Sequence, residues 1–144
     1  MYTFEDLLAI TKRLRAEDGC PWDRVQTHES LRGCMIEEAY EVVEAIDRKD
    51  DENLKEELGD VLLQVTMHSQ IASEEKRFDI ADVVNEISEK LIRRHPHVFG
   101  TTSVNSVDGV LKNWEEIKQT EKNEATAWEG LKRIPLSLPA ALRA

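Results

Sequence analysis

The chain has 144 residues, of which 40% are hydrophobic and 33% charged, and its formal net charge is −10 at pH 7. This length favours one domain with a hydrophobic core, and no apolar run approaches the roughly 20 residues that span a bilayer. The acidic balance argues against a general binder of nucleic acids or acidic membranes. Two cysteines are too few for a disulfide framework, so we expect a cytoplasmic protein.

Helical periodicity runs through most of the chain, whereas the period-two alternation of strands is hard to find. We predict a first helix that Thr3 and Asp6 begin as a capping box and that Gly19 ends. Four further helices are predicted over about 28–47, 51–75, 79–94 and 107–122. Long helices with short connections indicate an all-α fold, a bundle of about four to five helices around a central acidic helical hairpin.

The apolar stripes of the predicted helices are broad, above all on the second and third helices. A bundle this small can use surplus apolar area to associate with itself, so we expect a homodimer or a higher homo-oligomer. The positions expected to be buried include Ile46, Leu58, Leu62, Val84, Ile87, Leu91 and Leu111.

The central acidic hairpin carries two pairs of carboxylates, each with a spacing of three residues. Glu38 and Glu41 precede a polar turn near residue 49. Glu57 and Asp60 follow that turn at the same distance. Positions three apart share one face of a helix, so antiparallel packing brings both pairs to the same height. Four converging carboxylates repel one another unless cations lie between them, which predicts a metal site.

An acidic stripe is more often only the solvated face of a helix, and that alternative stays open for these residues. If a metal is bound, ligation by oxygen alone favours Mg²⁺, with Mn²⁺ as a possible substitute. A di-iron carboxylate bundle would need Glu-x-x-His pairs. Val65, and not a glutamate, lies three residues before His68, so the di-iron alternative is disfavoured.

A cationic cluster ends the helix predicted over 79–94. Lys90 and Arg94 are spaced four residues apart there and could form an anion site for phosphates, since arginine offers a planar fork. Basic residues at a helix C-terminus often only complement the helix dipole, so both interpretations stay open. Trp114 and Lys118 have the same spacing. For them, an apolar core residue beside a surface lysine is the commoner arrangement.

The loop 18–28 gathers an aromatic, an acid, an amide and an imidazole within a few residues. Trp22 and His28 in this loop could line a wall that binds a nucleobase. The same residues could instead cap a helix and bury the tryptophan. Spacing alone does not distinguish these two possibilities.

With these blocks in order along the chain, the sequence resembles the MazG family of nucleoside triphosphate pyrophosphohydrolases, and in particular the N-terminal module of longer MazG proteins. The metal motif of the family, E-E-x-x-E followed by E-x-x-D, stands here at residues 37–41 and 57–60. The flanking blocks that resemble the family are CPWDRVQTHESL, EELGDVLLQVTMHSQIA and RRHPHVFG. Several matching blocks in order are more specific than the acidic motif alone.

The resemblance implies an oligomeric, Mg²⁺-dependent hydrolase that splits a nucleoside triphosphate between the α and β phosphates. The products would be the monophosphate and pyrophosphate, and the role would be upkeep of the nucleotide pool. The candidate residues are Glu38, Glu41, Glu57 and Asp60 for the metal, and Lys90, Arg94, Trp114, Lys118, Trp22 and His28 for the substrate. Glu37 and Glu56 adjoin the metal ligands, and either could be the general base, with Glu37 preferred.

Residues 1–125 are expected to form this module, and residues 126–144 a C-terminal tail or the start of a connector, since longer family members carry two such modules in tandem. The alternative function is a non-catalytic helical interaction or regulatory module of a longer two-module protein. Besides the nucleotide and further copies of the chain, no nucleic-acid or membrane partner is expected.

Overall fold

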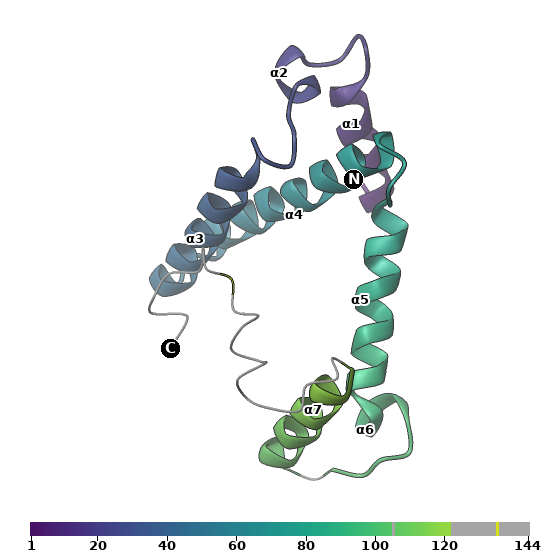
Figure 1. Cartoon of the computed structure of the whole chain (residues 1–144). Helices are drawn as coiled ribbons and strands as arrows, with labels where there is room; N and C mark the ends of the chain where they lie inside the picture. The colour runs from purple at the N-terminus through teal and green to yellow at the C-terminus, as the bar shows by residue number, and fades with distance from the viewer. Residues whose placement is uncertain (105, 122–134, 136–144) are drawn as a thin grey trace. The chain divides into compact units, whose positions relative to one another are not determined.

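Figure 1 shows the structure, a computed structural model that describes residues 1–104, 106–121 and 135. The described residues form seven helices and no strand, which confirms the predicted all-α class. None of the described helices combines the length and the apolar character that crossing a membrane requires. The predicted boundary between residues 125 and 126 lies outside the described residues.

The chain divides into two compact units, Met1–Asn85 and Glu86–Ala144. The first unit contains α1 (Phe4–Arg15), α2 (Pro21–Arg24), α3 (Arg32–Arg48), α4 (Asp51–Glu74) and the beginning of α5 (Ile80–Arg94). The second unit contains the end of α5, α6 (Pro96–Phe99) and α7 (Val107–Glu121). The five longer helices correspond to the five predicted from periodicity, with ends that differ by a few residues.

The helix ends follow from residues that can be recognised in the sequence. The Thr3 side chain accepts a hydrogen bond from the backbone N–H of Asp6 at 3.2 Å, and the Asp6 carboxylate accepts one from the backbone N–H of Thr3 at 2.8 Å. The predicted capping box is therefore confirmed. The four-residue helices α2 and α6 are not predicted by periodicity. Each begins at a proline, Pro21 or Pro96, whose missing N–H is tolerated at the first helical position.

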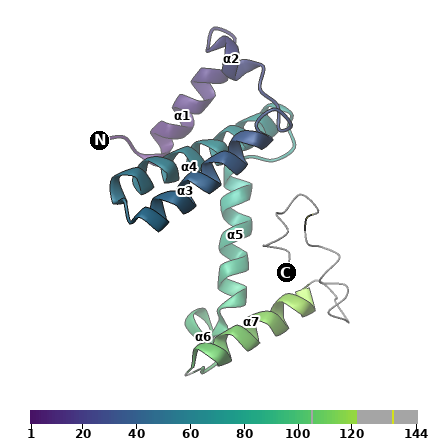
Figure 2. The same cartoon turned by 90° about the vertical axis from the view of Figure 1, so that its left-hand side faces the viewer.

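α3 and α4 form an antiparallel hairpin and lie side by side in both views (Figures 1 and 2). Lys49 ends α3 in the left-handed conformation, with φ 56°. The Asp50 side chain then caps α4 by accepting a hydrogen bond from the backbone N–H of Asn53 at 3.2 Å. This tight connection confirms the turn predicted near residue 49, and it fixes the register between the two helices.

The hydrophobic core of the first unit is a cluster of Leu31, Met67 and Ile71, against which Cys34 and Leu63 pack. These side chains come from the beginning of α3 and the C-terminal half of α4. Burying a side chain of this kind contributes about 1.5–3 kcal/mol. The core therefore holds the hairpin at the end opposite to its turn.

α1 contacts α4 through a buried polar pair. The hydroxyl oxygens of Thr11 and Thr66 lie 3.1 Å apart, and each residue is only 1% exposed. Each hydroxyl also lies 3.0 Å from a backbone carbonyl of its own helix. With two hydrogens for three contacts, one threonine donates to the other and the second donates to its helix.

Seven apolar positions that the sequence pattern predicts to be buried are between 38% and 58% exposed. They are Ile46, Leu58, Leu62, Val84, Ile87, Leu91 and Leu111. Periodicity identifies the apolar face of a helix, but it does not show whether another element of the same chain covers that face. Three of these exposed positions, Ile46, Leu58 and Leu62, lie on α3 and α4.

Candidate metal centre

The acidic hairpin brings three of the predicted metal ligands together. Glu38 and Glu41 come from successive turns of α3, and Glu57 comes from α4. One carboxylate oxygen of each lies within 4.8 Å of the other two. Their proximity agrees with the prediction that equal separations from the turn bring the acids of the two helices to the same height. Asp60 is not a member of this close group.

The acids of the cluster act on one another electrostatically. Burial raises the pKa of Glu38, and the negative charge of Asp60 raises it further. Burial also raises the pKa of Glu57, and the charges of Glu41 and Glu56 add to this effect. Asp60 contributes to the raised pKa of Glu57 as well, so its charge acts on both Glu38 and Glu57. A cation among these carboxylates would relieve the repulsion.

The donor set fits a hard divalent cation. The acids offer only carboxylate oxygens, which are ligands that Mg²⁺ and Mn²⁺ prefer. Two oxygens on opposite sides of one Mg²⁺ lie about 4.2 Å apart. Oxygens on adjacent positions of the same ion lie about 3 Å apart. Binding of one ion by all three acids therefore requires their oxygens, now within 4.8 Å of one another, to move closer together. Asp60 lies three residues after Glu57 on the same face of α4.

The neighbouring acids have different surroundings. Glu37 and Glu56 are both exposed, and the charge of Glu56 acts on Glu57. Glu44 forms an ion pair with Arg48 one turn further along α3. Glu44 is thus paired outside the cluster, whereas the two candidates for the general base face the solvent from which an attacking water would come.

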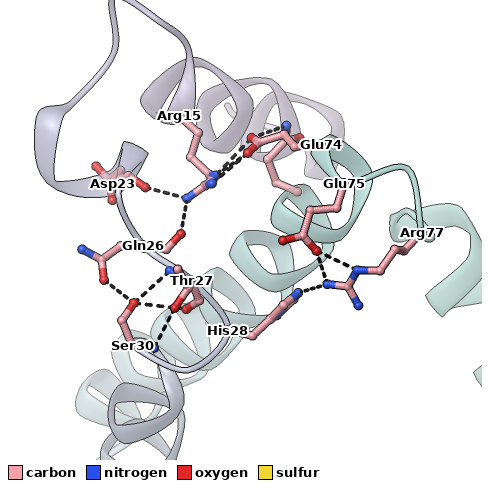
Figure 3. Close-up of polar contacts among 10 residues, drawn as sticks. Arg15, Asp23, Gln26, Thr27, His28, Ser30, Glu74, Glu75 and Arg77 are labelled. Carbon is pink, nitrogen blue, oxygen red and sulfur yellow. Dashed lines mark hydrogen bonds and ion pairs between the residues drawn. The ribbon is translucent and has the colours of Figure 1, made fainter.

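The loop between α1 and α3 is fixed by a buried arginine (Figure 3). Only 6% of the Arg15 side chain is exposed, and it forms an ion pair with Glu74 of α4. Its Nη1 donates to the backbone carbonyls of Asp23 and Gln26, at 2.6 and 3.1 Å. Arginine can make all these contacts because its planar fork carries five N–H donors. Trp22 on this fixed loop is 58% exposed, so the possibility that the loop buries it is wrong.

His28 belongs to a chain of three hydrogen-bonded side chains, and Figure 3 shows its contact with Arg77. Nη2 of Arg77 lies 2.5 Å from Nε2 of His28, and Nδ1 of His28 lies 2.7 Å from Nδ1 of His68. Because arginine only donates, Nε2 of His28 accepts and its Nδ1 carries the proton. His68 then accepts at Nδ1. Burial, followed by the neighbouring His28, lowers the pKa of His68, in agreement with a neutral ring.

Two of the predicted substrate-binding residues, Arg94 and Lys118, lie against a third, Trp114, in the second unit. The guanidinium carbon of Arg94 and Nζ of Lys118 lie 5.6 and 4.9 Å from the centre of its ring, in cation–π contacts. Glu121 accepts two hydrogen bonds from Arg94, at 3.0 and 2.7 Å. Lys90 instead lies 3.9 Å from a carboxylate one turn earlier on α5.

Sequence reasoning misses the roles of Arg15, Arg77 and Glu121, whose charges hold these groups in place. Each lies at or just beyond the end of a helix, where a charged side chain is ordinarily solvated. Local spacing offers no signal for such residues, because their partners are distant in the chain. Arg15 and Glu74, for example, are separated by 59 residues.

The chain matches the family model described as the MazG nucleotide pyrophosphohydrolase domain over residues 26–99. It is 56% identical over 121 residues to the nucleoside triphosphate pyrophosphohydrolase/pyrophosphatase MazG of Thermotoga maritima, a match that covers 84% of this chain and 46% of that protein. It is 47% identical over 145 residues to the nucleoside triphosphate pyrophosphohydrolase of Escherichia coli, covering 100% of this chain and 55% of that protein. The chain thus spans about half the length of these curated relatives.

The fold is also similar to that of a solved structure. The crystal structure of a mazG-related protein from Thermotoga maritima matches with a TM-score of 0.67 and 30% sequence identity, over 80% of this chain and 98% of that chain. The residues that match the family model, 26–99, include the whole α3–α4 hairpin with both acidic pairs. The chain therefore belongs to the MazG nucleotide pyrophosphohydrolase family.

Proposed function

We propose that this chain hydrolyses nucleoside triphosphates between the α and β phosphates and releases the nucleoside monophosphate and pyrophosphate, in a reaction that depends on Mg²⁺. The observation that carries the proposal is the approach of oxygens from Glu38, Glu41 and Glu57 to within 4.8 Å in a chain of this family. The names of the two relatives support the class of reaction. The role would be upkeep of the nucleotide pool in the cytoplasm.

The acidic site can bind a triphosphate only if a cation lies between them, because the carboxylates and the phosphates repel each other. The four acids Glu38, Glu41, Glu57 and Asp60 would hold Mg²⁺ or Mn²⁺. When bound, such an ion polarises the phosphoryl group and lowers the pKa of a coordinated water. The contribution of the hairpin is to fix this charge at one place before the substrate arrives.

The attacking water also needs a proton acceptor beside the cluster. Glu37 and Glu56 are proposed for this role because both adjoin the ligands and are exposed. Glu37 is our first choice. The variants Glu37→Gln and Glu56→Gln distinguish the two, because loss of the general base lowers kcat without lowering the affinity for Mg²⁺.

The cationic residues are proposed to bind the phosphates. Lys90, Arg94 and Lys118 would offset the charge of the departing pyrophosphate, arginine through its fork and lysine as a point charge. Arg94 is bound by Glu121 in the structure. Phosphate binding at Arg94 would therefore have to compete with that carboxylate.

The aromatic residues are proposed to contact the nucleobase. Trp22 is exposed on a loop that Arg15 holds, so it presents a fixed ring face for stacking. Trp114 is proposed as a second such contact. His28 uses both ring nitrogens within the protein, so it would meet a substrate through a carbon edge of its ring.

A second copy of the chain is proposed to cover the exposed apolar face of α3. Ile36, Tyr40 and Val43 recur at the spacing of one helix face and are 51%, 53% and 51% exposed. On α4, Leu58 and Leu62 are also exposed. Exposed large apolar residues that share one helix face are typical of an interface, and a two-fold dimer is the commonest closed arrangement.

Incubation of the protein with a panel of nucleoside triphosphates and Mg²⁺ tests the proposed reaction. We expect release of pyrophosphate rather than orthophosphate, and EDTA should stop it. Glu41→Gln keeps the shape of a ligand but removes its charge, and should lower turnover at least about tenfold. Glu44→Gln, on the same helix but outside the cluster, is the matched control. Absence of turnover with both Mg²⁺ and Mn²⁺ would contradict the proposal.

The competing function is a non-catalytic helical interaction or regulatory module of a longer two-module protein. The observation in its favour is that the chain covers only 46% and 55% of the two relatives described above. Such a module would bind Mg²⁺ or a basic partner through the acidic hairpin without turning over any nucleotide. The same assay, combined with a Mg²⁺ binding measurement, separates the two functions.

A further inference from the structure

Gln64 lies in α4 and is 7% exposed. Its side-chain oxygen Oε1 is buried and accepts no hydrogen bond from the described residues. The great majority of buried polar atoms in proteins have a partner, because an unsatisfied one loses the hydrogen bond that water would have given it. We therefore expect Oε1 of Gln64 to accept a hydrogen bond from a donor outside the described part of the chain.

Helical geometry places Gln64 on the same face of α4 as two acids of the cluster. Gln64 follows Asp60 by four residues and Glu57 by seven, so the three share one face of α4. Side chains on an α-helix lean toward its N-terminus. By this rule we expect the carboxamide of Gln64 to lie over the turn that carries Asp60.

The acids themselves cannot satisfy this oxygen. An ionised carboxylate only accepts hydrogen bonds, and so does Oε1 of a glutamine. A hydrated cation, however, brings donors with it. Mg²⁺ commonly keeps several of its water molecules when carboxylates bind it, and hydrogen bonds from such polarised O–H groups are stronger than those between neutral groups.

We propose that Gln64 is a positioning residue of the metal centre, whose Oε1 accepts a hydrogen bond from a water molecule in the hydration shell of the bound cation. This inference rests on the proposed cation site of Glu38, Glu41, Glu57 and Asp60. Gln64 touches neither the metal nor the reacting atoms. Its part is to fix the orientation of one water beside the carboxylates, from the layer between the acids and the apolar core.

Gln64→Met tests this role, because methionine keeps an unbranched side chain of similar length but lacks the oxygen. Mg²⁺ binding is measured by isothermal titration calorimetry with MgCl₂, and stability by thermal melting in EDTA. The Mg²⁺ dissociation constant should rise about tenfold or more, as is typical when a group that orients a metal ligand is removed. The melting temperature in EDTA should not fall, since the variant no longer buries an unpaired oxygen.

Gln70→Met is the matched control, because it makes the same change on the same helix where the amide donates to Glu74. It should leave the Mg²⁺ dissociation constant unchanged. Gln64→Glu is the second variant. It keeps an oxygen acceptor, so it should bind Mg²⁺ at least as tightly as the wild type, and it decides the outcome if Gln64→Met melts lower in EDTA.

Equal Mg²⁺ affinity of the wild type and Gln64→Met overturns the inference, whatever their melting temperatures, because Oε1 would then serve another partner. An equal loss of affinity in Gln64→Met and Gln64→Glu also overturns it, because the acceptor would not be the group that matters. A wild-type protein that binds neither Mg²⁺ nor Mn²⁺ removes the proposed cation site together with the inference. Failure of the inference alone leaves wild-type Mg²⁺ binding and pyrophosphate release intact.

Discussion

Arg94 and Glu121 form an ion pair with two hydrogen bonds: Nε and Nη2 of the arginine lie 3.0 and 2.7 Å from the same carboxylate oxygen, Oε2. Arg93 contacts the other oxygen. The two arginines end α5 and the glutamate ends α7, so the contact joins the two longer helices of the second unit. It also means that Arg94, a proposed phosphate contact, is neutralised within its own unit.

The pH dependence of this ion pair can be predicted. Hydrogen bonds from Arg93 and Arg94 lower the pKa of Glu121 from 4.5 to about 2. Since the folded pKa lies below the unfolded one, the stabilisation is complete above about pH 4.5 and is lost as the pH falls through about 2. Glu121→Gln should therefore melt below the wild type at neutral pH, and the gap should close as the pH falls toward 2.

Glu115→Gln is the control for that comparison. Glu115 lies 3.4 Å from Lys118, and 48% of its side chain is exposed, so its removal should change the melting temperature little at any pH. A gap between wild type and Glu121→Gln that stays constant from neutral pH down to about pH 2 would contradict the role assigned to the Glu121 carboxylate.

Arg15 is predicted to stabilise the first unit through its buried fork. Arg15→Met removes the contacts to Glu74 and to the backbone of the loop, and leaves the two carbonyls of Asp23 and Gln26 without their donor. Breaking a buried pair costs about 3–5 kcal/mol, and the 37% exposure of the Glu74 side chain reduces this to about 2–3 kcal/mol. Chemical denaturation measures the loss.

Arg13→Met is the matched control for Arg15→Met, because Arg13 lies on the same helix α1 and also pairs with an acid. Its pair with Asp18 is solvated, with side chains 60% and 79% exposed, so the variant should lose only about 0–1 kcal/mol. Arg15→Lys should behave like Arg15→Met rather than like the wild type, since an ammonium group cannot reproduce the fork. Equal losses in Arg13→Met and Arg15→Met would show that burial of Arg15 contributes nothing.

The apolar face of α3 is predicted to be an interface between two copies of the chain. Val43→Lys places a charge at one end of the stripe of Ile36, Tyr40 and Val43, where the native side chain is 51% exposed. If a second copy covers this face, the variant should be a monomer by light scattering coupled to size-exclusion chromatography. Lys55→Ala, at an exposed charged position of α4, should leave the oligomeric state unchanged. A monomeric wild type, or an equally dimeric Val43→Lys, would rule this interface out.

The parts of the fold that could be predicted are those determined by neighbours in the sequence. The capping box of Thr3 and Asp6 and the turn at Lys49 each involve residues at most a few positions apart. Exposure of Leu58 could not be predicted, because it depends on what lies over the helix and not on the helix itself. Periodicity gives the direction in which a side chain points, but the burial of that side chain is a property of the assembled unit.

The same distinction holds for the candidate metal centre. The proximity of Glu38, Glu41 and Glu57 could be predicted from the sequence, because one turn sets the register of the two helices. That Oε1 of Gln64 has no donor among the described residues could not be predicted, since this depends on where the atoms of several helices lie. Nor could the pairing of Arg15 with Glu74, because no local rule relates residues 59 positions apart.

Removal of one carboxylate is predicted to stabilise the metal-free protein. Burial first, and neighbouring acids second, raise the pKa values of Glu38 and Glu57. A raised pKa in the folded state means that folding is penalised as the pH rises above the ordinary value of 4.5. In EDTA near neutral pH, Glu41→Gln should therefore melt about 1–3 °C above the wild type. Near pH 4 and below, where the carboxylates take up protons, this difference should vanish.

In saturating Mg²⁺, the wild type should instead melt at a higher temperature than Glu41→Gln. A ligand that binds only the folded state stabilises it by about 2.7 kcal/mol at one hundred times its dissociation constant, and the wild type has the fuller set of ligands to bind it. Mg²⁺ should raise the melting temperature of Glu41→Gln by less than that of the wild type. The control Glu44→Gln only breaks the exposed pair with Arg48, so Mg²⁺ should raise its melting temperature by as much as that of the wild type. If Glu41→Gln melts below the wild type in EDTA, or gains equally from Mg²⁺, then Glu41 does not belong to a repulsive cluster that a cation neutralises.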